Sequence, residues 1–155
     1  MRWLKRWWPA LVWGLVISSF STGAFTPEHT SRVIVPVLHW LFPQMPMETL
    51  ELIHHAIRKC AHFAEYFILS LLILRGIRAG RKETRLAWAL LAILVVTAYA
   101  SLDEFHQSFV PGRTAAVGDV LIDTSGGVAA QLLAALFVLW GEVRERRREN
   151  AVKTV

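Results

Sequence analysis

Charge and cysteine are both scarce in this chain of 155 residues. Charged residues make up 19% of it, whereas soluble proteins average about 25%, and hydrophobic residues reach 54%. The single cysteine, Cys60, excludes an intrachain disulfide and a zinc ribbon. These scarcities argue against an ordinary soluble domain, and they predict a membrane protein.

Stretches with little or no charge identify the candidate membrane spans. A helix needs about 20 mostly apolar residues to cross the hydrocarbon layer of a bilayer. Four segments meet this requirement, with approximate bounds 7–27, 58–77, 86–105 and 118–141. We therefore predict an all-α membrane protein with a single domain over 1–155, four transmembrane helices and a basic cytoplasmic tail at 142–155.

A fifth apolar run, Val33–Met47, is interrupted by Pro36, Pro43 and Pro46. Interior prolines make a spanning helix improbable, because each removes a helical hydrogen bond. We predict an interfacial segment here, between the first two spans, with Trp40 at the depth of the lipid headgroups.

The 17 Lys and Arg residues are distributed unevenly along the chain. Three precede the first span, five separate the second from the third and five lie in the tail, whereas the other two connections contain three and one. The positive-inside rule then predicts a multi-pass protein of the inner (cytoplasmic) membrane with both termini in the cytoplasm. Topology and contact with anionic lipids account for the net charge of +5, so nucleic acid is not expected as a partner. The first apolar segment is also compatible with a cleaved signal peptide, which would leave the orientation of the rest unchanged.

In this topology all six histidines and several carboxylates lie in the outer half. On the second helix, His62 and Glu65 are three residues apart and share one face. On the third helix, Asp103, His106 and Gln107 are spaced i, i+3, i+4 near the outward end, and Glu104 lies on a neighbouring face.

The fourth helix adds a further acidic face, formed by Asp119 and Asp123, four residues apart. A turn with type II geometry is predicted just before it at Val110–Arg113, because Pro and Gly occupy the favoured positions. The face continues as a stripe of small residues, Gly126 or Gly127, Ala130 and Ala134, of the kind that lets helices approach closely in lipid. The three acidic faces are therefore predicted to meet in a polar pocket that opens outward.

Three segments carry a resemblance to a known family: RKCAHFAEY at 58–66, YASLDEFHQSFVPGR at 99–113 and GDVLIDTSGG at 118–127. In order and spacing the chain resembles the VanZ-like family. The resemblance implies a small integral membrane protein linked to low-level teicoplanin resistance, without an established reaction. It also implies ten signature positions without assigned roles, which we take as candidate ligand-binding residues: Lys59, His62, Glu65, Asp103, Glu104, His106, Gln107, Arg113, Asp119 and Asp123.

Two functional hypotheses follow for the pocket. In the first, it recognises the headgroup of an outer-leaflet phospholipid or lipid-linked cell-wall intermediate, and Lys59 and Arg113 contact the phosphate. In the second, it processes such a lipid, with His62 or His106 as general base and Glu65 or Asp103 orienting it. The carboxylates and histidines also leave a divalent metal open, but no motif commits the chain to one.

Two other interpretations remain open. An ion path through the acidic residues is disfavoured, because the inner half of each helix lacks a relay partner. A non-catalytic accessory or structural role, in which the charged residues form an intramembrane ion-pair network, is the main alternative. The small-residue stripe also leaves a homo-oligomer open.

Overall fold

The computed structural model describes residues 2–81, 85–113 and 116–153. Its elements are α1 (Arg2–Phe20), a short 3-10 helix η1 (Gly23–Phe25), α2 (Pro27–Leu41), α3 (Met47–Arg78), α4 (Leu86–Gln107) and α5 (Val117–Lys153). No strand occurs within the described ranges, and the predicted all-α class is confirmed. Lys82 and the last two residues of the predicted tail lie outside these ranges.

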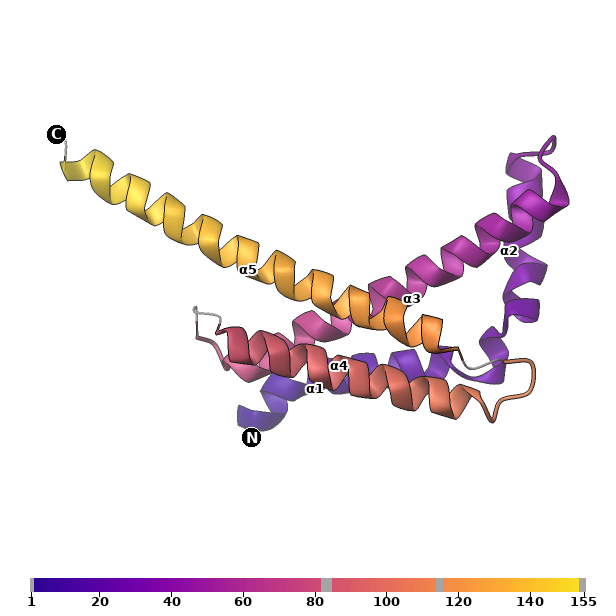
Figure 1. Cartoon of the computed structure of the whole chain (residues 1–155), viewed down its shortest axis with the longest axis horizontal. Coiled ribbons are helices and arrows are strands. Elements are labelled where there is room, and N and C mark those ends of the chain that lie inside the picture. The colour runs from indigo at the N-terminus through magenta and orange to yellow at the C-terminus, as the bar shows by residue number, and fades with distance from the viewer. Residues whose placement is uncertain (1, 82–84, 114–115, 154–155) are drawn as a thin grey trace.

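Four helices, α1, α3, α4 and α5, run between two ends of the molecule, and α2 turns away from the long axis (Figure 1). Both termini and the α3–α4 connection lie toward one end. We call it the basic end, because α3 finishes there with Arg75 and Arg78 and α4 begins after Arg85. The α1–α2 bend and the α4–α5 connection lie at the opposite end, which we call the cavity end.

Three helices are long and apolar enough to span a membrane on their own: α3, α4 and residues Val117–Arg148 of α5. The segments Leu4–Phe20 and Gly23–Leu41 pass the same test only as a pair, and they are bent by 64°. The molecule therefore has three candidate spans, or four if the bent pair is counted as one span.

Helix α1 ends at Phe20, short of the predicted span boundary at residue 27. A second helix start explains the early ending, because Thr26 caps α2 by accepting a hydrogen bond from the backbone N–H of His29 at 3.3 Å. Pro27 follows in the first turn, where the missing N–H costs nothing. The uncharged sequence alone could not reveal this interruption.

Helix α3 begins at Met47, well before the predicted boundary at residue 58. Its first turns pack against α2, where Leu50 is fully buried and the His54 imidazole bonds to the hydroxyl of Thr30 at 3.1 Å. The segment predicted to be interfacial is therefore largely helical, and Pro36 lies inside α2. The position of this segment relative to a bilayer stays a prediction.

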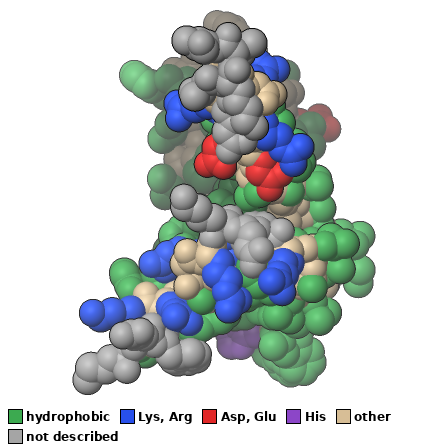
Figure 2. Space-filling view, turned by 90° about the vertical axis from the view of Figure 1, so that its left-hand side faces the viewer, with side chains coloured by type: hydrophobic (Ala, Val, Ile, Leu, Met, Phe, Trp, Pro, Cys, Tyr) green, Lys and Arg blue, Asp and Glu red, His purple; other side chains and the backbone are tan. Residues whose placement is uncertain are grey.

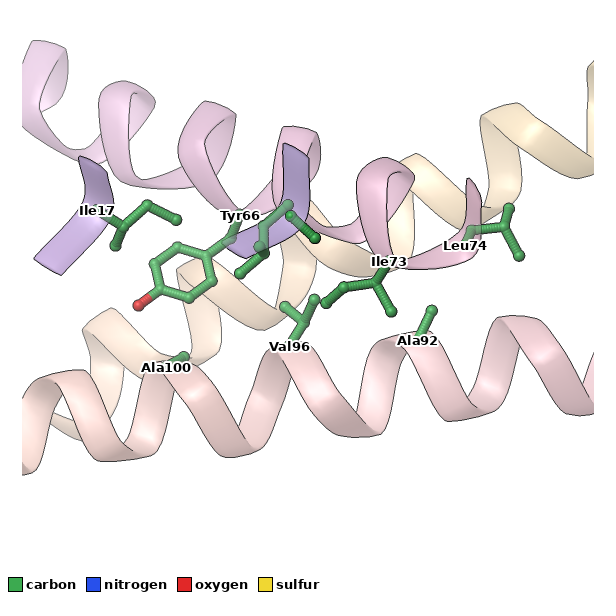
Figure 3. Packing of buried hydrophobic residues seen from close by; sticks show 9 residues of the cluster. Ile17, Tyr66, Ile73, Leu74, Ala92, Val96 and Ala100 are labelled. Carbon is green, nitrogen blue, oxygen red and sulfur yellow. The ribbon is translucent and has the colours of Figure 1, made fainter. Parts of the chain in front are cut away.

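The apolar core lies in the middle of the bundle (Figure 3). Ile17 of α1 and Tyr66 and Ile73 of α3 face Val96 and Ala100 of α4, and each is almost or fully inaccessible to solvent. Between helices in lipid, such side chains stabilise the bundle by close van der Waals packing, because lipid tails are as apolar as they are. These contacts fix α1, α3 and α4 relative to one another.

Small residues of α5 lie against α3 and α4 in the same region. A Cβ added at Gly126 would collide with the backbone carbonyl of Phe63, and one added at Gly127 would lie 2.9 Å from Cγ1 of Val96. Ser70 of α3 also donates a hydrogen bond to the carbonyl of Gly127 at 3.0 Å. The predicted small-residue stripe is therefore confirmed as a helix-packing face.

Figure 2 looks onto the basic end and shows Lys and Arg side chains gathered there over a largely hydrophobic body. One of these cations ties two helices together, because Nη1 of Arg75 donates to the carbonyl of Arg6 at 3.2 Å. The ionisable groups of the predicted pocket lie toward the other end.

Candidate functional site

A cavity of about 230 Å³ opens at the cavity end, between α1, α2, α3 and the α4–α5 connection. Four ionisable side chains contribute to its wall: Arg58, His62, Glu65 and Arg113. The rest of the wall is apolar or neutral and is formed by Phe20, Ser21, Phe25, Thr30, Ile34, Ile57 and Ala61. The cavity wall therefore combines charges of both signs with several apolar side chains.

Two guanidinium groups lie on this wall and share one acceptor. Nη1 of Arg58 donates to the backbone carbonyl of Phe25 at 3.1 Å and to the hydroxyl of Thr30 at 3.0 Å. Nη2 of Arg113 donates to the same Phe25 carbonyl at 2.9 Å and to the carbonyl of Phe20 at 2.6 Å. Within the described ranges neither arginine forms an ion pair with a carboxylate.

The turn before α5 positions Arg113. Its backbone N–H donates to the carbonyl of Val110 at 3.1 Å, and Gly112 has a positive φ of 78°, as the third residue of a type II turn requires. The predicted turn is confirmed. Burial lowers the pKa of the Arg113 guanidinium, whereas Asp103 and Glu104 oppose the shift. Arginine starts from so high a pKa that the group stays charged.

Glu65 is half-buried on the cavity wall. Its backbone carbonyl accepts a hydrogen bond from Nε1 of Trp13 at 2.9 Å, which fixes this turn of α3 against α1. Its carboxylate makes no hydrogen bond or ion pair with any residue that the structure describes.

His62 lies between the cavity and a fully buried carboxylate. Nδ1 of His62 is 3.4 Å from Oδ1 of Asp123 on α5, whose side chain is 0% exposed. No hydrogen-bond partner reaches either oxygen of Asp123 within the described part of the chain. The His62 side chain also lines the cavity, so a general base at this position would be oriented by Asp123. From the sequence, Glu65 or Asp103 is expected in that orienting role.

Asp103 belongs to a hydrogen-bonded chain that holds Arg113 in place. Its Oδ2 accepts from the hydroxyl of Ser21 at 2.7 Å and from Nε2 of Gln107 at 2.9 Å. The amide oxygen of Gln107 in turn accepts from Nη1 of Arg113 at 2.9 Å. This chain joins α1, α4 and the turn, so Asp103 and Gln107 support the wall and do not line it.

Lys59 and Asp119 form an ion pair with each other, and neither lines the cavity. The predicted contact of Lys59 with a ligand in this cavity therefore has no support. Glu104 is buried and accepts from the backbone N–H of Ala116 at 3.0 Å, which anchors the start of α5.

His106 is exposed, makes no side-chain hydrogen bond or ion pair within the described residues and does not line the cavity, so the structure does not bring it into the site. The buried residues at this end of α4 are Asp103, Glu104 and Gln107, so the inward face is centred between them and His106 lies on the far side of Asp103.

Sequence reasoning missed Arg58, which lines the cavity where Lys59 had been expected. The signal was present in the spacing, since Arg58, His62 and Glu65 are related by i, i+4 and i+7 and lie on one face of a helix. Lys59 is rotated by one residue, or about 100°, away from that face.

A metal site finds no support in the arrangement. Within the described ranges no group of three or more His, Cys, Asp or Glu side chains is placed to hold a metal ion.

Comparison with known protein families identifies a relationship. A model of the VanZ/LLP1 family matches residues 7–138, which is most of the chain and includes every residue of the cavity wall. No curated protein and no solved structure matches.

Proposed function

Because the chain belongs to the VanZ/LLP1 family and has the apolar helices of a multi-pass membrane protein, we propose that its cavity binds the phosphate-bearing headgroup of a membrane lipid. One observation carries the proposal. Arg58 and Arg113 meet on one wall without a carboxylate partner in the described part of the chain. Guanidinium groups bind phosphate with charge-assisted and often bidentate hydrogen bonds.

Unused donors of the two arginines support this assignment. Each guanidinium has five N–H donors, and Nε of Arg113 is buried without a partner. The shared Phe25 carbonyl holds the two groups together at a spacing that a single phosphate can bridge.

The leaflet and the orientation are part of the proposal. Most Lys and Arg residues lie in segments that connect or end at the basic end, which favours that end for the cytoplasm. The cavity then faces the outer leaflet of the cytoplasmic membrane. The teicoplanin resistance implied by the resemblance extends the proposal to the cell envelope, and glycopeptide susceptibility of cells with and without the protein tests that extension.

A structural role for part of the charged set is the second candidate. The Lys59–Asp119 ion pair and the Ser21–Asp103–Gln107 bonds favour it, because they join helices and only Ser21 among these residues lines the cavity. Under this candidate, substitutions lower the stability of the fold and leave any lipid contact unchanged.

Native mass spectrometry of the full chain purified in detergent tests the proposed function. We expect phospholipid to remain bound to the wild type, and the double variant Arg58→Gln/Arg113→Gln to lose it. Charged hydrogen bonds contribute about 1.5–3 kcal/mol each, so the loss in affinity should exceed about tenfold.

Arg32→Gln is the matched control for this experiment. Arg32 is an exposed cation of α2 that lies outside the cavity wall. Equal lipid retention by the folded double variant and the control would refute the proposed function.

A further inference from the structure

The cavity also presents one negative group beside the two arginines. The carboxylate of Glu65 lies on the same wall and has no hydrogen-bond donor or cation paired with it in the described ranges. A half-buried carboxylate on a helix that spans a membrane is costly unless a partner or water compensates its charge.

The neighbouring cations attract the Glu65 carboxylate through space, but none forms an ion pair with it within the described ranges. Nδ1 of His62 is directed at Asp123, whereas Arg58 and Arg113 are bonded to the carbonyls of Phe20 and Phe25 and to other neutral groups. The wall therefore has separate sites for an anionic group and for a cationic group.

The size of the cavity limits what can fill it. Its volume of about 230 Å³ lies below the roughly 300–1,000 Å³ of sites for drug-sized ligands. A phosphate joined to a short amino alcohol is a small group, whereas the glycan of a lipid-linked cell-wall intermediate is much larger. The volume therefore favours a simple phospholipid headgroup.

The apolar side chains of the cavity wall indicate a lipid and not a soluble phosphate ester. Phe20, Phe25 and Ile57 line the cavity, and each remains about two-fifths exposed. The rings of Phe20 and Phe25 pack edge to face with their centroids 5.0 Å apart. The acyl-glycerol group of a lipid has apolar surface that matches these side chains, whereas a soluble phosphate ester has none.

Building on the proposed phosphate-binding function, we infer that the ligand is an aminophospholipid of the phosphatidylethanolamine type. Its phosphodiester binds Arg58 and Arg113, and its ammonium group binds Glu65. The positive group distinguishes this lipid from phosphatidylglycerol, whose headgroup would leave the carboxylate without a cation. Glu65 is thus the residue that determines headgroup specificity.

Competition between the two lipids tests the inference. The full chain in detergent is mixed with equal amounts of phosphatidylethanolamine and phosphatidylglycerol, and the bound fractions are measured by native mass spectrometry. We expect the wild type to prefer phosphatidylethanolamine by about tenfold, as one charge-assisted contact provides. Glu65→Gln should lose this preference while still binding phosphatidylglycerol, and Glu65→Asp should keep part of it.

Glu51→Gln is the matched control, because Glu51 is an exposed carboxylate of the same helix that lies outside this cavity. The inference is overturned if the wild type binds both lipids equally, or if Glu65→Gln keeps the preference. It is also overturned if soluble phosphoethanolamine displaces the lipid at equal concentration. If the proposed phosphate-binding function itself is wrong, the wild type binds neither lipid, so the two failures give different results.

Discussion

The middle of the bundle and its cavity end hold the same helices together by opposite means. In the middle, Gly126 of α5 lies so close to the carbonyl of Phe63 on α3 that a methyl group would not fit. At the cavity end, one turn of α5 earlier, the side chains between these two helices are His62 and Asp123, two ionisable groups at 3.4 Å.

The two regions show which contacts stabilise the fold and which side chains are available to bind a ligand. Close packing gains stability from contact and tolerates almost no change in volume. Ionisable groups in lipid are costly, so they persist where they meet a partner or a ligand. Substitutions in the packed region should therefore lower the stability of the fold without changing lipid binding. Substitutions of the ionisable groups should change stability, lipid binding or both, depending on the partner of each group.

The largest loss of stability is expected from His62→Leu. The substitution leaves the fully buried Asp123 without the one group that forms an ion pair with it in the described ranges, and breaking a buried pair in this way costs about 3–5 kcal/mol. The double variant His62→Leu/Asp123→Asn should recover most of the loss, because no charge is then buried. Thermal unfolding in detergent measures both, and a double variant as unstable as the single one would contradict the prediction.

A smaller loss is expected from Gly126→Ala. The added Cβ overlaps a backbone carbonyl, which cannot rotate away, and overpacking of this kind costs about 1–3 kcal/mol. Lipid binding by the folded fraction should be unchanged, because neither Gly126 nor Phe63 is part of the cavity wall. Gly118→Ala in the same helix is the control, since nothing lies within 4 Å of its added Cβ. Equal stability of the two variants would show that the close approach does not limit packing.

The smallest effect is expected from Lys59→Gln. The Lys59 and Asp119 side chains remain 37% and 27% exposed, and such ion pairs contribute about 0.2–1 kcal/mol. Lipid binding should stay at the wild-type level, unlike that of the arginine variants. If Lys59→Gln lost as much bound lipid as Arg58→Gln, Lys59 would have to contact the ligand, which would contradict the assignment of the cavity wall.

The spacing of polar residues predicted much of the cavity end. The i, i+3 and i, i+4 patterns of α3, α4 and α5 placed His62, Glu65, Asp103 and Asp123 near one another, because a helix fixes which side chains share a face. The turn before α5 was also predictable, because Pro111 and Gly112 specify its geometry.

Other features depend on contacts between distant segments, which helical spacing does not encode. The bend after Phe20 and the early start of α3 arise because α2 packs against the first turns of α3. The choice between Arg58 and Lys59 depends on how α3 is rotated relative to α2 and to the turn that holds Arg113. Adjacent cations in a sequence cannot show which one faces inward.

The most direct test of this account measures how added phosphatidylethanolamine shifts the unfolding temperature. A ligand that binds the folded state raises its stability in proportion to the logarithm of ligand concentration over the dissociation constant. The account predicts the same upward shift for the wild type and for Gly126→Ala, although the variant starts lower, and no shift for Arg58→Gln/Arg113→Gln. An equal shift in the arginine double variant would contradict the claim that the two guanidinium groups form a lipid headgroup site.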